Sequence, residues 1–155
     1  MMNVLYNNHY QIVQSPGYVM IMAEMVHDAR VIRLDGKHPP ENITPWLGDS
    51  IGHWEGNTLV VETTNFNPQH TFRGGLRHFF AITSGAIVTE RFTRISKDQI
   101  LYRFYVDDPD IYSQVWAGEM PLRSVEDKIY EYACHEGNYS MANILAGARE
   151  EEKRR

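Results

Sequence analysis

Glutamates stand in alternating apolar segments at positions where a carboxyl group can face a protein interior. Glu90 shares one face of a predicted strand with Ala86, Val88 and Phe92. If this face points inward, desolvation raises the pKa of the carboxyl group and suits it to general acid or base catalysis. Buried acids are usually paired, so the alternative is a structural ion pair with an arginine on the next strand, such as Arg103.

Glu62 raises the same question in the predicted strand 58–64. It shares a face with Val60 and Thr64, and the opposite face of the strand is equally apolar. Both orientations of this strand therefore stay open. We take Glu62 and Glu90 as candidate catalytic residues.

Three ionisable side chains surround the chain reversal at residues 24–30. A carboxylate (Glu24), an imidazole (His27) and a guanidinium (Arg30) at the mouth of a β-structure can together bind an anion or move a proton. The alternative is a turn stabilised by Asp28 and by surface ion pairs, which contribute about 0–1 kcal/mol each. We take His27 and Arg30 as candidate catalytic residues and Glu24 as a candidate ligand contact.

Aromatic and imidazole side chains supply the other candidate ligand contacts. Trp54 and Phe104 lie in alternating segments and offer apolar surface to a ligand. Tyr132 and His135 lie near the end of a predicted strand, where a tyrosine hydroxyl in a cavity can donate to a developing oxyanion. Alternatively, His135 and its polar neighbours bind the backbone where the strand passes into a terminal helix.

The histidines and the cysteine show no metal-ligand spacing, and no cofactor motif is present. None of the seven histidines shows His-x-His or His-x-x-x-His spacing, and the pair His53 and Glu55 would need a distant third ligand. The single cysteine, Cys134, excludes an intramolecular disulfide and a zinc–thiolate cluster. We therefore expect neither a metal nor a cofactor.

The charge and hydropathy patterns exclude two classes of partner. The net charge is −5 and no basic stripe is present, which argues against nucleic-acid binding. The best apolar run, residues 19–26, is too short to span a bilayer, so we expect no membrane partner.

The first residues show no signal-peptide pattern. A length of 155 residues fits one domain, 1–155.

Period-two alternation, the pattern of half-buried strands, covers most of the chain. It predicts strands at residues 10–14, 18–25, 29–34, 52–55, 58–64, 86–94, 99–107, 113–122 and 128–135. The period then changes, because Met141, Ile144, Leu145 and Ala148 follow the spacing i, i+3, i+4, i+7. This spacing predicts an amphipathic helix over residues 139–153.

About nine short strands joined mostly by hairpins predict a mainly β fold. We expect an antiparallel meander β-barrel of about eight or nine strands, with a sandwich as the alternative, closed by the C-terminal helix. A barrel of this size can hold one small ligand. The irregular stretch 65–84 is long for a connection, which indicates a lid over the barrel or a subunit contact.

Three segments carry a resemblance to known proteins. Residues 48–66 read GDSIGHWEGNTLVVETTNF, residues 24–30 read EMVHDAR and residues 130–139 read YEYACHEGNY. Together they resemble a broad group of uncharacterised bacterial proteins, whose members often look exported, which implies a periplasmic or secreted location. The motif Gly52-His53-Trp54 also resembles the Gly-x-Trp of lipocalin-like (calycin) barrels, in which the tryptophan closes the barrel base.

Three functions follow from these patterns. The first is a cofactor-independent lyase, isomerase or hydratase that transfers protons through residues inside a β-barrel. The second is a non-catalytic, lipocalin-like binding protein for a hydrophobic small molecule. The third is an interaction or assembly domain, in which the Phe-rich stretch and the terminal helix bury against a second chain and form a homo-oligomer.

Overall fold

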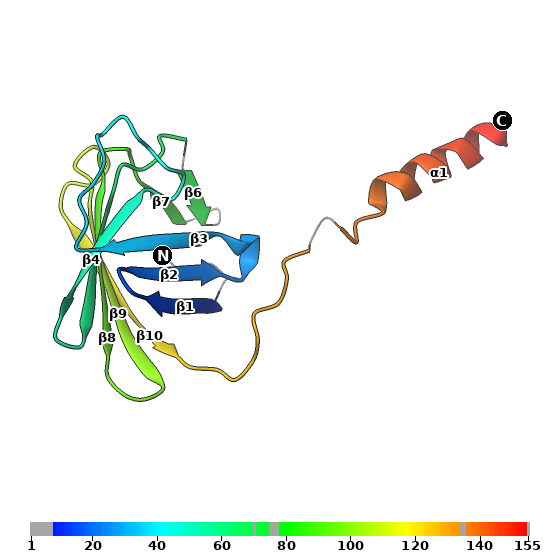
Figure 1. Cartoon of the computed structure of the whole chain (residues 1–155). Helices are drawn as coiled ribbons and strands as arrows, with labels where there is room; N and C mark the ends of the chain where they lie inside the picture. The colour runs from blue at the N-terminus through cyan, green and yellow to red at the C-terminus, as the bar shows by residue number, and fades with distance from the viewer. Residues whose placement is uncertain (1–7, 70, 75–77, 134–135, 155) are drawn as a thin grey trace.

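The fold is a curled β-sheet followed by one helix (Figure 1). The computed structural model describes residues 8–69, 71–74, 78–133 and 136–154. Its elements are β1 (Tyr10–Ser15), β2 (Tyr18–Ala23), the short 3-10 helix η1 (Met25–His27), β3 (Ala29–Leu34), β4 (Asp49–Glu55), β5 (Thr58–Thr64), β6 (Thr71–Gly74), β7 (His78–Ala81), β8 (Ile87–Arg94), β9 (Gln99–Asp107), β10 (Trp116–Arg123) and α1 (Ser140–Lys153).

Eight strands form one sheet in the order β1-β2-β3-β4-β5-β8-β9-β10, and β6 with β7 forms a separate hairpin. The sheet curls into a half-barrel, which confirms the predicted mainly β, barrel-like fold. One neighbouring pair departs from the predicted meander, because β3 and β4 are parallel. Parallel neighbours need a long return connection. The proline-containing excursion 35–48 provides that connection.

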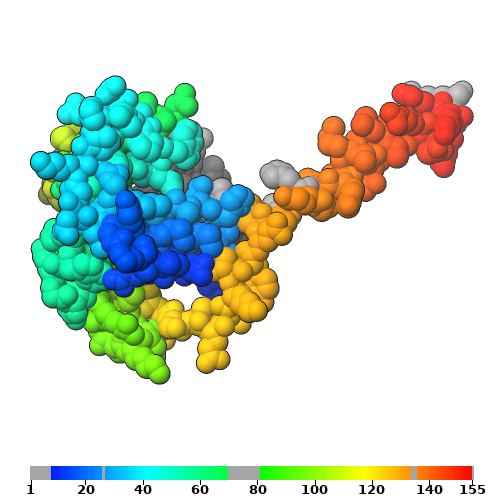
Figure 2. Space-filling view, viewed as in Figure 1, coloured from blue at the N-terminus to red at the C-terminus, as the bar shows by residue number. Residues whose placement is uncertain are grey.

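The curl of the sheet does not close. β1 and β10 are the two edge strands, and neither takes the other as a neighbour. Figure 2 shows an opening between β1, in blue, and the chain around and after the end of β10, in yellow and orange. The sheet therefore leaves an opening between its two edge strands along this seam.

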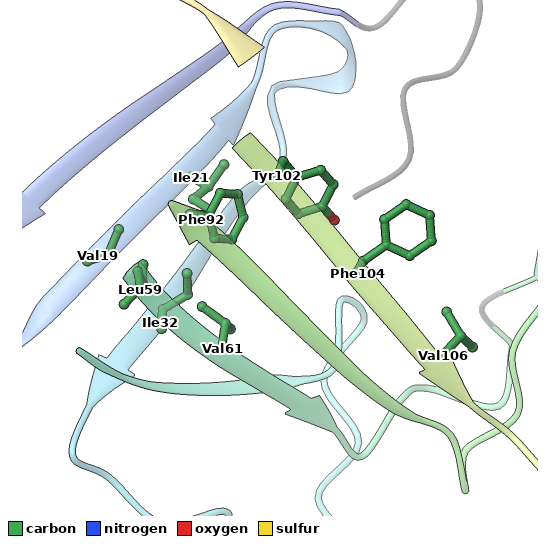
Figure 3. Close-up of a cluster of buried hydrophobic side chains, with 9 residues drawn as sticks. All are labelled: Val19, Ile21, Ile32, Leu59, Val61, Phe92, Tyr102, Phe104 and Val106. Atoms are coloured by element: carbon green, nitrogen blue, oxygen red, sulfur yellow. The ribbon is translucent and has the colours of Figure 1, made fainter. Parts of the chain in front are cut away.

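Alternating side chains of the strands fill the closed part of the half-barrel. In β5, for example, Leu59 and Val61 point inward and are buried, as are Val19 and Ile21 of β2. Figure 3 shows how these side chains gather with Ile32 and Phe92, while Tyr102, Phe104 and Val106 continue the apolar surface along β9. Burial of this apolar surface is the main stabilising contribution to the fold.

Two glycines allow close approaches that a side chain would prevent. A Cβ on Gly52 of β4 would lie 2.9 Å from the Cγ2 atom of Ile32. A Cβ on Gly118 of β10 would collide with the ring of Phe104. Phe104 and Gly118 are cross-strand partners, so the ring lies over the bare backbone of β10.

Two predictions about the C-terminal part meet different outcomes. The helix is present as α1, but none of its residues is buried, and it projects from the sheet instead of closing it (Figure 1). The predicted strand 128–135 is wrong over residues 128–133, which carry no strand. Within the described residues, no helix is long and apolar enough to cross a membrane.

Candidate functional site

A buried polar cluster lies inside the half-barrel, formed by Arg30 of β3, Glu90 of β8 and Tyr102 of β9. Glu90 is 0% exposed and Arg30 is 8% exposed. The two terminal nitrogens of Arg30 donate to the two carboxylate oxygens of Glu90, with a distance of 3.1 Å between Nη2 and Oε1. The Tyr102 hydroxyl also donates to Oε1, at 2.7 Å. Such a bidentate pair fixes both groups in position.

The charges within the cluster determine its protonation. Burial alone would raise the pKa of Glu90, but the positive charge of Arg30 and the hydrogen bonds from Arg30 and Tyr102 hold this pKa well below its usual value. Burial, together with the Glu90 carboxylate, raises the pKa of the Tyr102 hydroxyl far above its usual value. At neutral pH the cluster therefore consists of a carboxylate, a guanidinium and a neutral phenol, with no net charge.

Small hydroxyl residues on neighbouring strands complete the surroundings of Arg30. Its Nη1 atom also donates to the Thr63 hydroxyl at 3.4 Å, and Thr63 is in turn 2.8 Å from the Ser50 hydroxyl. The Nε atom of Arg30 is buried and has no hydrogen-bond partner among the residues that the structure describes. An unpaired buried donor is costly. The cluster is thus held in place at a cost in stability.

Aromatic rings lead from this cluster toward the open seam. Phe92 stacks on Tyr102 with ring centroids 4.8 Å apart, and Tyr102 stacks on Phe104 at 5.7 Å. Phe104 meets the edge of Trp116 at 5.5 Å, and Tyr112 meets Trp116 at 5.6 Å. The row begins at the ion pair and ends on β10, the edge strand.

The two edge strands carry apolar side chains on their inner faces, which we call the seam groove. On β10 these are Trp116, Met120 and Leu122, and on β1 they are Tyr10 and Ile12. Tyr10, Trp116, Met120 and Leu122 are partly buried, and Ile12 is exposed, at 41%. Apolar surface left accessible at a concave opening is typical of a small-molecule site.

The predicted catalytic residues separate into two groups. Arg30 and Glu90 come together in the buried cluster, although they are 60 residues apart in sequence. The expected rise in the pKa of Glu90 is wrong, because Arg30 lowers it. An ion pair was the stated alternative, but its partner is Arg30, whereas Arg103 pairs with Glu119.

The other two predicted catalytic residues lie on the outside. His27 ends η1, is exposed and has a φ of 49°. Glu62 points away from the interior and lies 3.2 Å from Nε2 of His38. The Nδ1 atom of His38 is 2.7 Å from Asp49, which also accepts two hydrogen bonds from Arg33. This outer network ties the excursion 35–48 to the sheet.

The predicted ligand contacts are placed as follows. Phe104 is buried in the aromatic row. Trp54 lies at one end of β4 and is 47% exposed. Glu24 is partly buried and accepts a hydrogen bond from the Tyr130 backbone N–H, and Tyr132 is partly buried. His135 lies outside the described residues.

Sequence reasoning did not single out Tyr102 or Trp116 as site residues. Tyr102 lies on the inner face of β9 with Phe104 and Val106. The same alternation that placed Glu90 inward also places Tyr102 inward, directly across from Phe92. Knowledge of the strand pairing would therefore have identified Tyr102, whereas only the fold reveals that Trp116 lies at an open edge.

Among the described residues, no group of three or more histidine, cysteine, aspartate or glutamate side chains is placed to hold a metal ion. The resemblances to bacterial proteins and to lipocalin-like barrels stay predictions. Comparison with family models, curated proteins and solved structures finds no match to this chain, so the interpretation of the site depends on its own geometry.

Proposed function

We propose that this protein binds an uncharged, largely apolar small molecule in the seam groove. The observation that carries the proposal is the partly exposed apolar inner face of β10 and β1 at the place where the sheet fails to close. A fully packed core would leave no such surface. Trp116, partly exposed beside the buried ring of Phe104, offers an aromatic ring against which a ligand ring can pack.

The groove's composition supports an uncharged ligand. The inner positions of β1, β9 and β10 carry no charged side chain, and Gln14 is the most polar of them. The Arg30–Glu90 ion pair deeper in the half-barrel has no net charge. A charged ligand would lose its hydration here without gaining a partner, which is strongly unfavourable.

A fluorescence titration with N-phenyl-1-naphthylamine, a neutral apolar probe, tests this proposal. We expect saturable binding that Met120→Glu weakens by about tenfold or more, since a charge then enters the groove. Ala117→Glu is the matched control, because it adds the same charge to the outer face of the same strand. Equal affinities of the two variants would contradict the assignment of the groove.

A proton-transfer enzyme is the second candidate. It is favoured by the presence of a carboxylate, a phenol and a guanidinium within hydrogen-bonding distance of one another. The lowered pKa of Glu90 makes its carboxylate a weak base, and the raised pKa of Tyr102 makes its hydroxyl a weak acid. Both pKa shifts therefore favour a binding protein over a proton-transfer enzyme. If turnover of a compound that binds the groove is found, Glu90→Gln should abolish it while Glu62→Gln preserves it.

A further inference from the structure

The outer face of the first three strands carries a group of apolar side chains. Strand pairing aligns Val13 of β1, Met20 of β2 and Val31 of β3 in one row across this face. Val13 and Val31 are exposed, and Met20 is only partly buried. We call this row, together with its two neighbours on β2, the outer patch: Val13, Tyr18, Met20, Met22 and Val31.

The outer face of the remaining strands is charged instead. Glu55 of β4 pairs with Arg91 of β8, and Arg103 of β9 pairs with Glu119 of β10. On β1, β2 and β3 the only charged residue of the outer face is Arg33, at one end of the outer patch. An antiparallel sheet normally carries polar residues on a face that meets water. The outer patch therefore has the composition of a face that is covered.

The helix α1 carries another uncovered apolar surface. Its apolar stripe consists of Met141, Ile144, Leu145 and Ala148, and no residue of the helix is buried. An isolated helix of 14 residues is only marginally stable in water. Helices of this length usually depend on packing of their apolar face, yet α1 projects away from its own sheet (Figure 1).

The stripe and the outer patch match in size. A helix of 14 residues is about 21 Å long and about 10 Å wide. Three strands of six residues each form a face about 20 Å long and about 14 Å wide. One helix therefore covers the patch. Two reciprocal contacts between two chains enclose a flat footprint of about 800 Å² over all four surfaces, which is typical of a weak, reversible interface.

We propose that α1 of one copy packs its apolar stripe on the outer patch of a second copy, which returns the same contact and closes a two-fold dimer. In one chain the two surfaces do not meet, so each takes its partner from another copy. Glu151 continues the stripe beyond Ile144, and Arg33 pairs with Asp49 at the end of the patch. An orientation with the C-terminal end of α1 over Arg33 thus brings opposite charges together.

The dimer contact does not involve the seam groove. The outer patch lies on the face of β1 to β3 that points away from the half-barrel interior, so this inference is independent of the proposed function. At concentrations well below the dissociation constant the chain is a monomer in which α1 stays free.

Sedimentation equilibrium of the full chain, from about 1 μM to about 1 mM, tests the dimer. Val31→Lys places a charge in the outer patch, and Ile87→Lys is its control, because Ile87 is an exposed apolar residue on the outer face of β8. Leu145→Lys places a charge in the stripe, and Asn143→Lys is its control on the opposite face of α1. All four positions are exposed in the single chain, so each variant should fold, which circular dichroism verifies.

We expect the unaltered protein and both controls to dimerise equally well. Val31→Lys and Leu145→Lys should each raise the dissociation constant by about tenfold or more, because a charge is then buried in the contact. An equimolar mixture of these two variants should associate more tightly than either variant alone, since it retains one intact pair of stripe and patch.

Three results would each refute the proposal. The first is an unaltered protein that stays monomeric throughout, which includes the case of α1 packing on its own sheet. The second is a dimer that neither Val31→Lys nor Leu145→Lys weakens. The third is a mixture of the two variants that associates no better than its components. If Val31→Lys does not fold, Val13→Lys makes the same test on the edge strand.

Discussion

The substitution Glu90→Gln is the most informative perturbation of the buried cluster. It keeps the size of the side chain and one carbonyl acceptor but removes the negative charge. Arg30, only 8% exposed, would then be a buried cation without a counterion. Water cannot readily take the place of the carboxylate, because Glu90 itself is 0% exposed.

The expected magnitude follows from this burial. Removing one partner of a buried ion pair costs about 3–5 kcal/mol, since the remaining charge keeps its desolvation penalty. Glu62→Gln is the matched control, because it makes the same chemical change on the outer face, where an ion pair contributes about 0–1 kcal/mol. The two substitutions therefore separate burial from the chemistry of the residue.

Urea unfolding monitored by tryptophan fluorescence measures both free energies of unfolding. The double variant Arg30→Met with Glu90→Leu should recover most of the loss, because apolar residues of similar volume often replace a buried pair without penalty. If Glu90→Gln costs no more than Glu62→Gln, the cluster is not a buried ion pair and the electrostatic argument is refuted. If Glu90→Gln does not fold, a folded double variant still supports it.

Three further outcomes are expected. The pKa of Glu90 in the folded state lies below the ordinary value of 4.5, so the stabilisation that Glu90 contributes is complete above that pH and is lost as the pH falls further. The free energy of unfolding should therefore decline more steeply below pH 4.5 in the unaltered protein than in Glu90→Gln. Parallel curves for the two proteins would contradict this. Asp108→Ala should lower the free energy of unfolding in urea by about 1–3 kcal/mol, since Asp108 is buried and accepts two hydrogen bonds from Thr83. A change near zero would show that water takes the place of the Asp108 carboxylate. Deleting residues 140–155 should change the unfolding free energy by about 0.5 kcal/mol or less, since no residue of α1 is buried; a larger loss would mean that the helix packs against the sheet.

The local pattern of the chain predicted most strands, because a strand with one buried face alternates visibly. The segments that became β8 and β9 show this well, with Phe92, Tyr102 and Phe104 on the inner face. The same pattern failed at 128–133, where Tyr130 and Tyr132 imitate alternation but no neighbouring strand is available to pair with. A strand needs a partner, and single-segment patterns do not contain that information.

The candidate site was only partly predictable, for a related reason. Inward placement of Glu90 followed from its apolar neighbours, but its partner Arg30 lies on β3, three strands away in the sheet. The parallel pairing of β3 with β4 sets that distance, and an excursion containing several prolines gives no sign of it. The pKa of Glu90 is lowered because Glu90 pairs with Arg30, and the sequence pattern, which does not show that ion pair, predicted a raised pKa instead.

The seam groove is the central claim, and an NMR titration tests it most directly. In ¹H–¹⁵N spectra of the unaltered protein, each tryptophan indole N–H gives its own signal. We expect the Trp116 signal to shift saturably as N-phenyl-1-naphthylamine is added, because Trp116 lines the groove, while the signal of Trp46 in the excursion 35–48 stays in place. Saturable binding of the probe with an unmoved Trp116 signal would contradict the account.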